Sequence, residues 1–189
     1  MNGNEQLTAL KADVARMNRL VQQLLRVARL DAIALDVSGT ADLNEVAADV
    51  VSSVAPWALA QGRNIALERI VGPVTVRGNR DAIGDAIRNV VENAVMHSPP
   101  QSEVAVVTSS NGSARVLDRG PGIPQQERQR IFERFWRGQN AMSQGAGLGL
   151  AIVKEIMKAH AGDISIDDNP GGGAVVTLRF RLATDGPPD

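Results

Sequence analysis

The sequence predicts an α+β fold: a two-layer α/β sandwich with helices on one face of a mixed sheet, preceded by a long N-terminal helix. Three observations lead to this class. Strand-like segments come in neighbouring pairs, helical segments lie between the pairs, and a separate heptad pattern fills the N-terminus. The 189 residues are 43% hydrophobic, which is enough for one buried core and an appended element.

Composition excludes several classes of function. The formal net charge is −1, so bulk charge favours neither nucleic acid nor an anionic membrane as a partner. The absence of cysteine excludes disulfides, thiolate catalysis and cysteine-based metal sites. No apolar run approaches the roughly 20 residues that cross a bilayer, and the first residues lack the apolar stretch of a secretion signal.

Residues 1–33 are expected to form a long helix. Their apolar residues recur at alternating spacings of three and four, the heptad pattern of a helix that packs on other helices. These residues are Leu7, Leu10, Val14, Met17, Val21, Leu24 and Ala28. Leu20 and Leu25 widen the stripe, which favours a coiled coil or bundle over packing on the chain's own domain. A linker is expected over residues 34–42.

The globular part is expected to begin with a helix over residues 43–61. Asp42 is a favourable N-cap residue, and Gly62 is a common helix stop. Residues 63–70 and 73–78 then have the roughly alternating, β-branched pattern of two strands joined by a Gly-Pro turn.

A second helix is expected from the Asn79 N-cap to His97. The residues expected to face the core are Ile83, Ala86, Ile87, Val90 and Ala94. Asn89 and Asn93 lie one turn apart at the edge of this stripe. They are either ordinary surface asparagines or a joint ligand site, since a neutral amide oxygen suits Mg²⁺ that also contacts phosphates.

Hairpins and one further helix are expected in the rest of the globular part. In order, the predicted elements are a hairpin of 103–110 and 113–118 around Asn111-Gly112, a short helix over 125–133, a polar loop over 137–147, a helix over 148–160, and a closing hairpin of 163–168 and 173–182. The globular domain is expected to span residues 43–183, and residues 184–189 are expected to be a disordered tail.

Two segments combine glycines with groups that suit a nucleotide-like ligand. Gly145, Gly147 and Gly149 alternate directly before a predicted helix, whose free N–H groups attract anions such as phosphate, although a flexible surface loop is an equal alternative. Asp118 ends a predicted strand and precedes two glycines, so it is either part of a plain turn or an acceptor for an amino group on a ring-shaped ligand.

An aromatic segment lies between these two glycine segments. Phe132, Phe135 and Trp136 are expected to pack in the core at the root of the following loop. Arg134 and Arg137 beside them either reach a phosphate or are simply solvated.

The order of these signals resembles bacterial two-component sensor histidine kinases. An Asn-bearing helix, D-x-G-x-G, an aromatic segment and G-x-G-x-G before a helix are similar to that family's N box, first glycine box, F box and second glycine box. The resemblance implies the Bergerat ATP-binding fold. It also implies that residues 1–33 are the second helix of a dimerisation and histidine-phosphotransfer hairpin, whose first helix is absent here.

The resemblance assigns expected roles to individual residues. Asn93 would ligate Mg²⁺ with help from Asn89, and Asp118 would accept from the adenine amino group. The other implied ATP-binding positions are His97, Gly120, Gly122, Ile123, Arg137, Gly145, Gly147, Leu148 and Gly149, with residues 137–144 as the lid. Met96 stands where the family often has a phosphate-contacting Lys, so Arg137 or a lid residue is expected to supply that charge.

The implied activity is transfer of the ATP γ-phosphate to a histidine, for onward transfer to an aspartate of a response regulator. No H-E-x-x-x-P-like motif occurs, so this chain is expected to contain no catalytic residue and not to autophosphorylate alone. The resemblance further implies homodimerisation through the N-terminal helix, a cytoplasmic location for this portion, and a parent protein anchored in the bacterial inner membrane.

Three other functions remain open at this point. An ATPase of the same superfamily usually has a Glu where this chain has Asn89, which favours a kinase. A protein-serine kinase of the anti-sigma type usually lacks the heptad helix, and a non-catalytic, nucleotide-gated interaction module needs only the pocket. A P-loop signature is absent, and the G-x-G-x-G segment follows a polar loop rather than the strand of a dinucleotide-binding unit.

Overall fold

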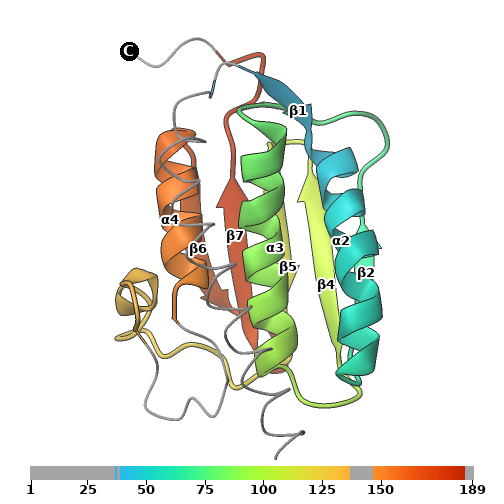
Figure 1. Cartoon of the computed structure of the whole chain (residues 1–189), viewed down its shortest axis with the longest axis vertical. Helices are drawn as coiled ribbons and strands as arrows, with labels where there is room; N and C mark the ends of the chain where they lie inside the picture. The colour runs from blue at the N-terminus through green and yellow to red at the C-terminus, as the bar shows by residue number, and fades with distance from the viewer. Residues whose placement is uncertain (1–36, 38, 137–146, 186–189) are drawn as a thin grey trace, which may run out of the picture.

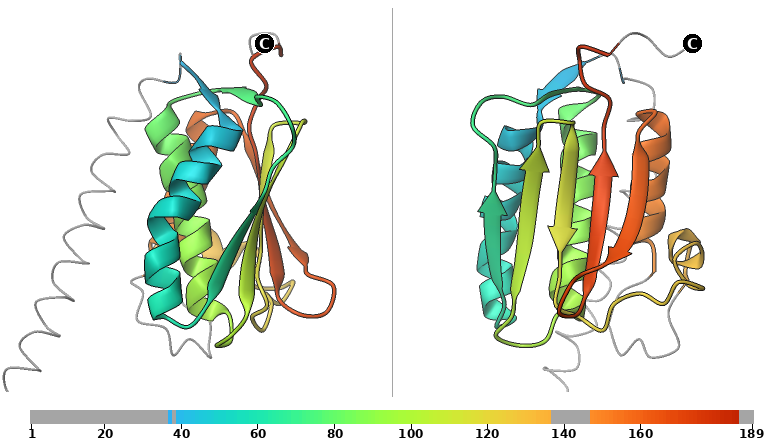
Figure 2. Two further views of the ribbon diagram at one scale, coloured as in Figure 1. Left: turned by 90° about the vertical axis from the view of Figure 1, so that its right-hand side faces the viewer. Right: turned by 180° about the vertical axis from the view of Figure 1, so that it is seen from behind.

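The protein folds as two layers, with helices packed on one face of a twisted sheet (Figures 1 and 2). The computed structural model describes residues 37, 39–136 and 147–185. The predicted fold class is confirmed for this part of the chain. The predicted helix over 1–33, the lid residues 137–144 and the end of the tail lie outside the described residues. In the described ranges, no helix is both long and apolar enough to cross a membrane.

The described elements follow the predicted order. The helices are α2 (Leu43–Ala60), α3 (Arg80–His97) and α4 (Gly149–Ala159), with a 3₁₀ turn at Arg130–Phe132. The strands are β1 (Thr40–Asp42), β2 (Asn64–Glu68), β3 (Thr75–Arg77), β4 (Glu103–Ser109), β5 (Ser113–Leu117), β6 (Asp163–Asp168) and β7 (Ala174–Arg179). The main sheet has the order β2-β4-β5-β7-β6, in which only the β2–β4 pair is parallel.

The two strands predicted at 63–70 and 73–78 do not form a hairpin with each other. β2 pairs in parallel with β4, whereas β3 pairs with β1 in a separate two-stranded sheet. β1 itself lies in the segment expected to be a linker, where Ala41 is buried. Both differences arise from pairing between segments far apart in the sequence, which a local pattern does not encode.

The short helix predicted over 125–133 is also wrong in its extent. Most of the segment consists of turns, and only Arg130–Phe132 is a 3₁₀ helix. Arg128 explains the tight path, since its guanidinium donates to Ile123 O at 3.0 Å and to Ile166 O at 3.1 Å. This side chain therefore ties the segment to β6.

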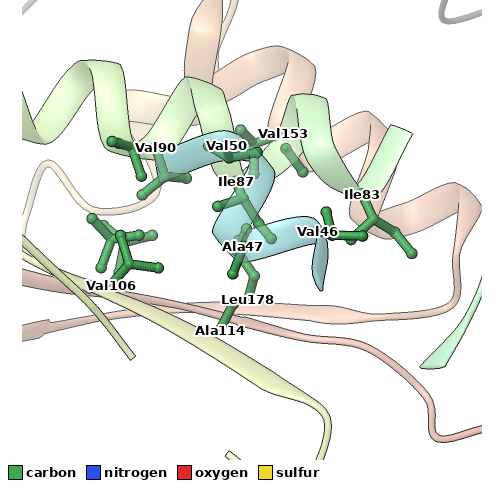
Figure 3. Packing of buried hydrophobic residues seen from close by; sticks show 14 of the residues in the cluster. Val46, Ala47, Val50, Ile83, Ile87, Val90, Val106, Ala114, Val153 and Leu178 are labelled. Atoms are coloured by element: carbon green, nitrogen blue, oxygen red, sulfur yellow. The ribbon is translucent and has the colours of Figure 1, made fainter. Parts of the chain in front are cut away.

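The core lies between the helices and the sheet (Figure 3). The whole stripe predicted for α3 is buried, as expected. Side chains shown meeting there are Val46, Ala47, Val50, Ile83, Ile87, Val90 and Val153 from the helices, and Val106, Ala114 and Leu178 from the sheet. Burying each larger side chain contributes about 1.5–3 kcal/mol, which holds α3 firmly in the middle of the helical layer.

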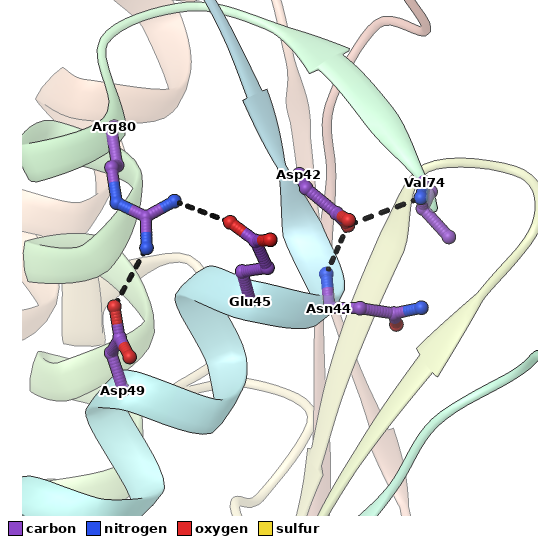
Figure 4. Close-up of polar contacts among 6 residues, drawn as sticks. All are labelled: Asp42, Asn44, Glu45, Asp49, Val74 and Arg80. Carbon is purple, nitrogen blue, oxygen red and sulfur yellow. Dashed lines mark hydrogen bonds and ion pairs between the residues drawn. The ribbon is translucent and has the colours of Figure 1, made fainter. Parts of the chain in front are cut away.

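Asp42 caps α2 as predicted and also links it to the segment before β3 (Figure 4). Its Oδ1 accepts from Asn44 N at 2.9 Å and from Val74 N at 3.1 Å. Nearby, Arg80 on α3 reaches Glu45 at 3.4 Å and Asp49 at 2.7 Å on α2. These carboxylates raise the pKa of Arg80, but exposed pairs of this kind stabilise a fold only weakly.

Asp42→Ala should therefore destabilise the fold by about 1–2 kcal/mol, because two backbone N–H groups lose their acceptor. We expect the melting temperature to fall by about 2–8 °C in differential scanning calorimetry. Asp42→Asn keeps an acceptor oxygen at the same place and is the matched control. Equal losses in the two variants would show that the cap bonds are not the cause.

Candidate functional site

Asn89, Asn93 and His97 lie at successive turns along one edge of α3, as the sequence predicts. Asn89 is more buried than expected, at 6% exposure, whereas Asn93 is half-buried. Asn89 Nδ2 donates to Asp85 O at 2.7 Å. Its Oδ1 points toward α4, since a Cβ added to Gly149 would lie 3.2 Å from that oxygen. The start of α4 therefore lies directly against this edge of α3.

Asp118 is held in one orientation at the end of β5. Its Oδ1 accepts from Gly120 N at 2.8 Å and from Ala174 N at 3.2 Å. Its backbone oxygen accepts from Asn169 Nδ2 at 2.7 Å. The side chain is 9% exposed, and within the described residues its Oδ2 has no hydrogen-bond partner. The carboxylate thus presents one acceptor, Oδ2, that no described residue uses.

The glycine segment after Asp118 lies against the end of α3. A Cβ added to Gly120 would come within 2.8 Å of His97 O, and one added to Gly122 would lie 3.3 Å from Gly173 O. Ile123 is half-buried and packs at the edge of the core. The residues predicted to surround a ring-shaped ligand are therefore together in space.

The start of α4 forms the other end of the site. Gly147 adopts a φ of +68° and accepts at its carbonyl from Phe135 N at 2.9 Å. Leu148 is buried and stands at the N-cap position, where no side chain caps the helix. The N-cap side chain thus supplies no acceptor to the first N–H groups of α4, and free N–H groups at a helix start attract an anion. Arg137 and Gly145 lie outside the described residues.

The prediction that all three aromatics pack in the core is wrong for Phe135, which is 70% exposed. Its backbone has a φ of +65°, in the turn that closes onto Gly147 O, and this conformation turns the ring outward. Phe132 and Trp136 are half-buried and pack against the core as expected.

Sequence reasoning missed Asn169 as a residue of the site. It lies in the β6–β7 turn, is buried, and holds the Asp118 backbone. An Asn followed by Pro and glycines is typical of a turn, so no separate signal in the sequence predicts this bond.

A groove of about 560 Å³ opens elsewhere, between α2 and α3, and none of the predicted ligand-binding residues lines it. Its lining residues are Val46, Asp49, Val50, Asn79, Arg80, Asp81, Gly84, Asp85 and Arg88. The groove is therefore separate from the candidate site that the polar and glycine segments build toward the other end of α3.

His97 has an altered protonation equilibrium at this site. Part of the side chain is in solvent, but burial of the rest lowers its pKa, and the neighbouring Asp118 carboxylate offsets this by a smaller amount. The imidazole is thus held mainly neutral near pH 7.

Acid titration should reveal this effect. Because the pKa is lower in the folded chain, the unfolded chain binds more protons as the pH falls below about 6.5, so the stability contributed by neutral His97 is lost. We expect His97→Gln to have a shallower fall in unfolding free energy than the parent between about pH 7 and pH 5, measured by urea denaturation. Parallel curves would contradict the inferred burial.

Comparisons with known proteins identify the family that this chain matches. Residues 78–184 match the family model described as histidine kinase-, DNA gyrase B-, and HSP90-like ATPase. The chain is 33% identical over 186 residues to a probable sensor histidine kinase, TcrY, of Mycobacterium tuberculosis, covering 95% of this chain and 38% of that protein. It is 30% identical over 183 residues to the sensor histidine kinase CpxA of Escherichia coli, covering 95% and 40%. The chain thus spans about two fifths of the length of these relatives.

Solved structures show the same relationship. The mycobacterial sensor histidine kinase MprB has a TM-score of 0.64 and 34% identity, covering 77% of this chain and 98% of that one. Full-length ShkA in complex with AMPPNP has a TM-score of 0.75 and 28% identity, covering 98% of this chain and 40% of that one. These matches show that the chain belongs to the histidine kinase-, DNA gyrase B-, and HSP90-like ATPase family and is homologous to sensor histidine kinases.

Proposed function

We propose that this chain is the ATP-binding catalytic portion of a sensor histidine kinase. The observation that carries the proposal is the Asp118 carboxylate, which lies on a residue that is 9% exposed, is fixed through Oδ1 and leaves Oδ2 without a partner among the described residues. Such an acceptor suits the exocyclic amino group of adenine. Because Gly120 has no side chain, the turn after Asp118 lies against His97 O, which places the carboxylate beside the end of α3.

The phosphates would then extend along α3 toward α4. The first N–H groups of α4 would donate hydrogen bonds to the negatively charged phosphate oxygens, and the positive end of the helix dipole would strengthen this binding. The edge amides suit Mg²⁺: Asn89 Oδ1 faces the start of α4, and the Asn93 side chain makes no hydrogen bond with another described residue. Neutral oxygens of this kind bind Mg²⁺ that keeps several waters and bridges phosphate groups. When bound, the ion would compensate the phosphate charge.

The proposed reaction moves the γ-phosphoryl group from ATP to a histidine nitrogen. The bond between the γ-phosphorus and the β,γ-bridging oxygen breaks, a phosphorus–nitrogen bond forms, and ADP leaves. The chain's own two histidines are unsuitable phosphate acceptors. His160 is buried with both ring nitrogens bonded, and His97 lies beside Gly120, at the end of the site proposed for adenine rather than for the γ-phosphate. The protein's contribution is placement and charge compensation.

The wider organisation follows from the same proposal. Residues 1–33 would be the second helix of a dimerisation and phosphotransfer hairpin, 34–42 a linker whose end, β1, pairs with β3, and 43–183 the catalytic domain. A response regulator would accept the phosphoryl group from the histidine. This portion would work on the cytoplasmic side of a membrane-anchored parent.

Hydrolysis of ATP is the second candidate, because the matched family also contains ATPases. Asn89, one turn before Asn93, argues against ATP hydrolysis. Asn89 has no basic atom to accept a proton from water, and its Nδ2 is already bonded to Asp85 O.

Radiolabelled ATP distinguishes these activities. With ATP labelled at the γ-phosphate, Mg²⁺ and a separately produced phosphotransfer hairpin from a relative such as TcrY, we expect label on the hairpin and none on the chain alone. Asp118→Asn is the control for dependence on the site. Fast release of phosphate without labelled hairpin would favour an ATPase, and nucleotide binding with neither reaction would favour an interaction module.

A further inference from the structure

His160 joins the end of α4 to the start of α3. It is 5% exposed, and both of its ring nitrogens are bonded. Nδ1 lies 2.8 Å from Ile156 O, and Nε2 lies 3.1 Å from Asn79 N. A carbonyl only accepts and a backbone N–H only donates, so Nδ1 carries the proton and Nε2 is the acceptor. The two bonds therefore select a single tautomer of the ring.

Asn79 uses two different groups in this contact. Its backbone N–H binds His160, while its side-chain Oδ1 accepts from Asp81 N and Ala82 N, each at 3.0 Å, and so caps α3. The bond from His160 therefore reaches the residue at which α3 begins.

The chain makes room for the ring at Gly78. This glycine has a φ of +132°, and a Cβ added to it would lie 2.0 Å from His160 Cδ2. Gly78 N also donates to Gly39 O at 2.8 Å, which fixes the backbone beside the ring. The ring is thus enclosed by backbone that only glycine permits.

The contact between His160 and Asn79 lies at one end of the antiparallel pair formed by α3 and α4, and the residues proposed to bind nucleotide lie toward the other end. α4 begins beside Asn89 and ends beside Asn79, and the two helices run side by side (Figures 1 and 2). The rise of a helix separates Asn79 from Asn89 by about 15 Å. Since helices are stiff along their axes, fixing α4 at its end also fixes where its first N–H groups lie.

We propose that His160 is a positioning residue for nucleotide binding: its Nε2 bond to Asn79 sets the axial position of α4 on α3 and so keeps Gly149 against Asn89. This inference rests on the proposed ATP-binding function. It assigns His160 no contact with the ligand.

Two substitutions separate the bonds that the ring makes. His160→Gln places an oxygen near the position of Nε2 and keeps an acceptor for Asn79 N–H. His160→Asn places an amide near Nδ1 and keeps only the bond to Ile156 O. For AMP-PNP with Mg²⁺, measured by calorimetry on the full chain, we expect His160→Asn to lose about tenfold in affinity and His160→Gln to stay within about threefold of the parent. Adenosine, which does not reach α4, should bind all three proteins equally.

A purely structural role predicts a different pattern. It would weaken AMP-PNP and adenosine binding together, or equally in the Gln and Asn variants, and either result would overturn the proposal. If His160→Asn does not fold, His160→Leu replaces it, since it keeps buried apolar volume and offers Asn79 N–H no acceptor, and the same selective loss for AMP-PNP is expected. Nitrogen-15 spectra of the parent should show a protonated Nδ1 and an unprotonated Nε2, and the opposite tautomer would also overturn it. Failure of the parent to bind AMP-PNP would instead reject the proposed function itself.

Discussion

Asp118→Asn is expected to raise the dissociation constant for ATP by about 100-fold while the fold stays intact. The new side chain keeps Oδ1, which accepts from Gly120 N and Ala174 N, so the two backbone donors stay satisfied. Its amide group replaces Oδ2 and places a donor opposite the donor of adenine. Calorimetric titration with AMP-PNP and GTP should show weak binding of both, without the preference for adenine.

Asp118→Ala is the informative companion to this variant. It removes Oδ1 as well, and each buried N–H left without an acceptor costs about 1–3 kcal/mol, so thermal stability should fall together with binding. Asp118→Asn with the affinity of the parent would mean that Oδ2 does not face adenine, and the orientation of nucleotide proposed above would be wrong.

Asn93→Ala is expected to abolish most of the gain in ATP affinity that Mg²⁺ provides, about tenfold or more. Binding without Mg²⁺ should stay within about threefold of the parent, because the side chain is proposed to act through the ion. Affinities for AMP-PNP measured with Mg²⁺ and with a chelator give the ratio directly.

The Asn93→Ala substitution is not expected to lower the stability of the fold, so a change in the Mg²⁺ ratio would report on binding. The Asn93 side chain makes no hydrogen bond with another described residue, and Ala is a better helix former than Asn, so the melting temperature should stay equal or rise slightly. Asn64→Ala, at an exposed position on β2, removes a matched amide away from α3. The same Mg²⁺ ratio in the parent and Asn93→Ala would exclude Asn93 as a ligand.

Local signals in the sequence predicted much of the fold. Asp42 and Asn79 cap the predicted helices, and Asn111-Gly112 turns the predicted hairpin, because each of these effects acts over a few residues. β1 and the parallel β2–β4 pair were not predictable in this way, since their stability comes from strands that are distant in the sequence.

The site was predicted to a similar degree. The order of the polar and glycine segments indicated the residues that meet at the ends of α3, β5 and α4. It did not indicate that Asn89 is buried and bonded to Asp85 O, nor that Asn169 and Ala174 hold Asp118, because those bonds depend on how α3 and the β6–β7 turn pack. The ligand-binding roles of all these residues stay predictions, and Arg137 and Gly145 lie outside the described ranges.

The sheet order has a consequence for how the protein is made on the ribosome. β7 follows β6 in the sequence, yet it lies between β5 and β6 in the sheet, and Ala174 at its start supplies a bond to Asp118. During synthesis, β5 leaves the exit tunnel well before β7 does, and the edge of β5 that β7 will cover then stays without a partner. The carboxylate of Asp118 therefore reaches its final orientation only after β7 has emerged, and a nascent chain stalled before β7 would have an incomplete nucleotide pocket.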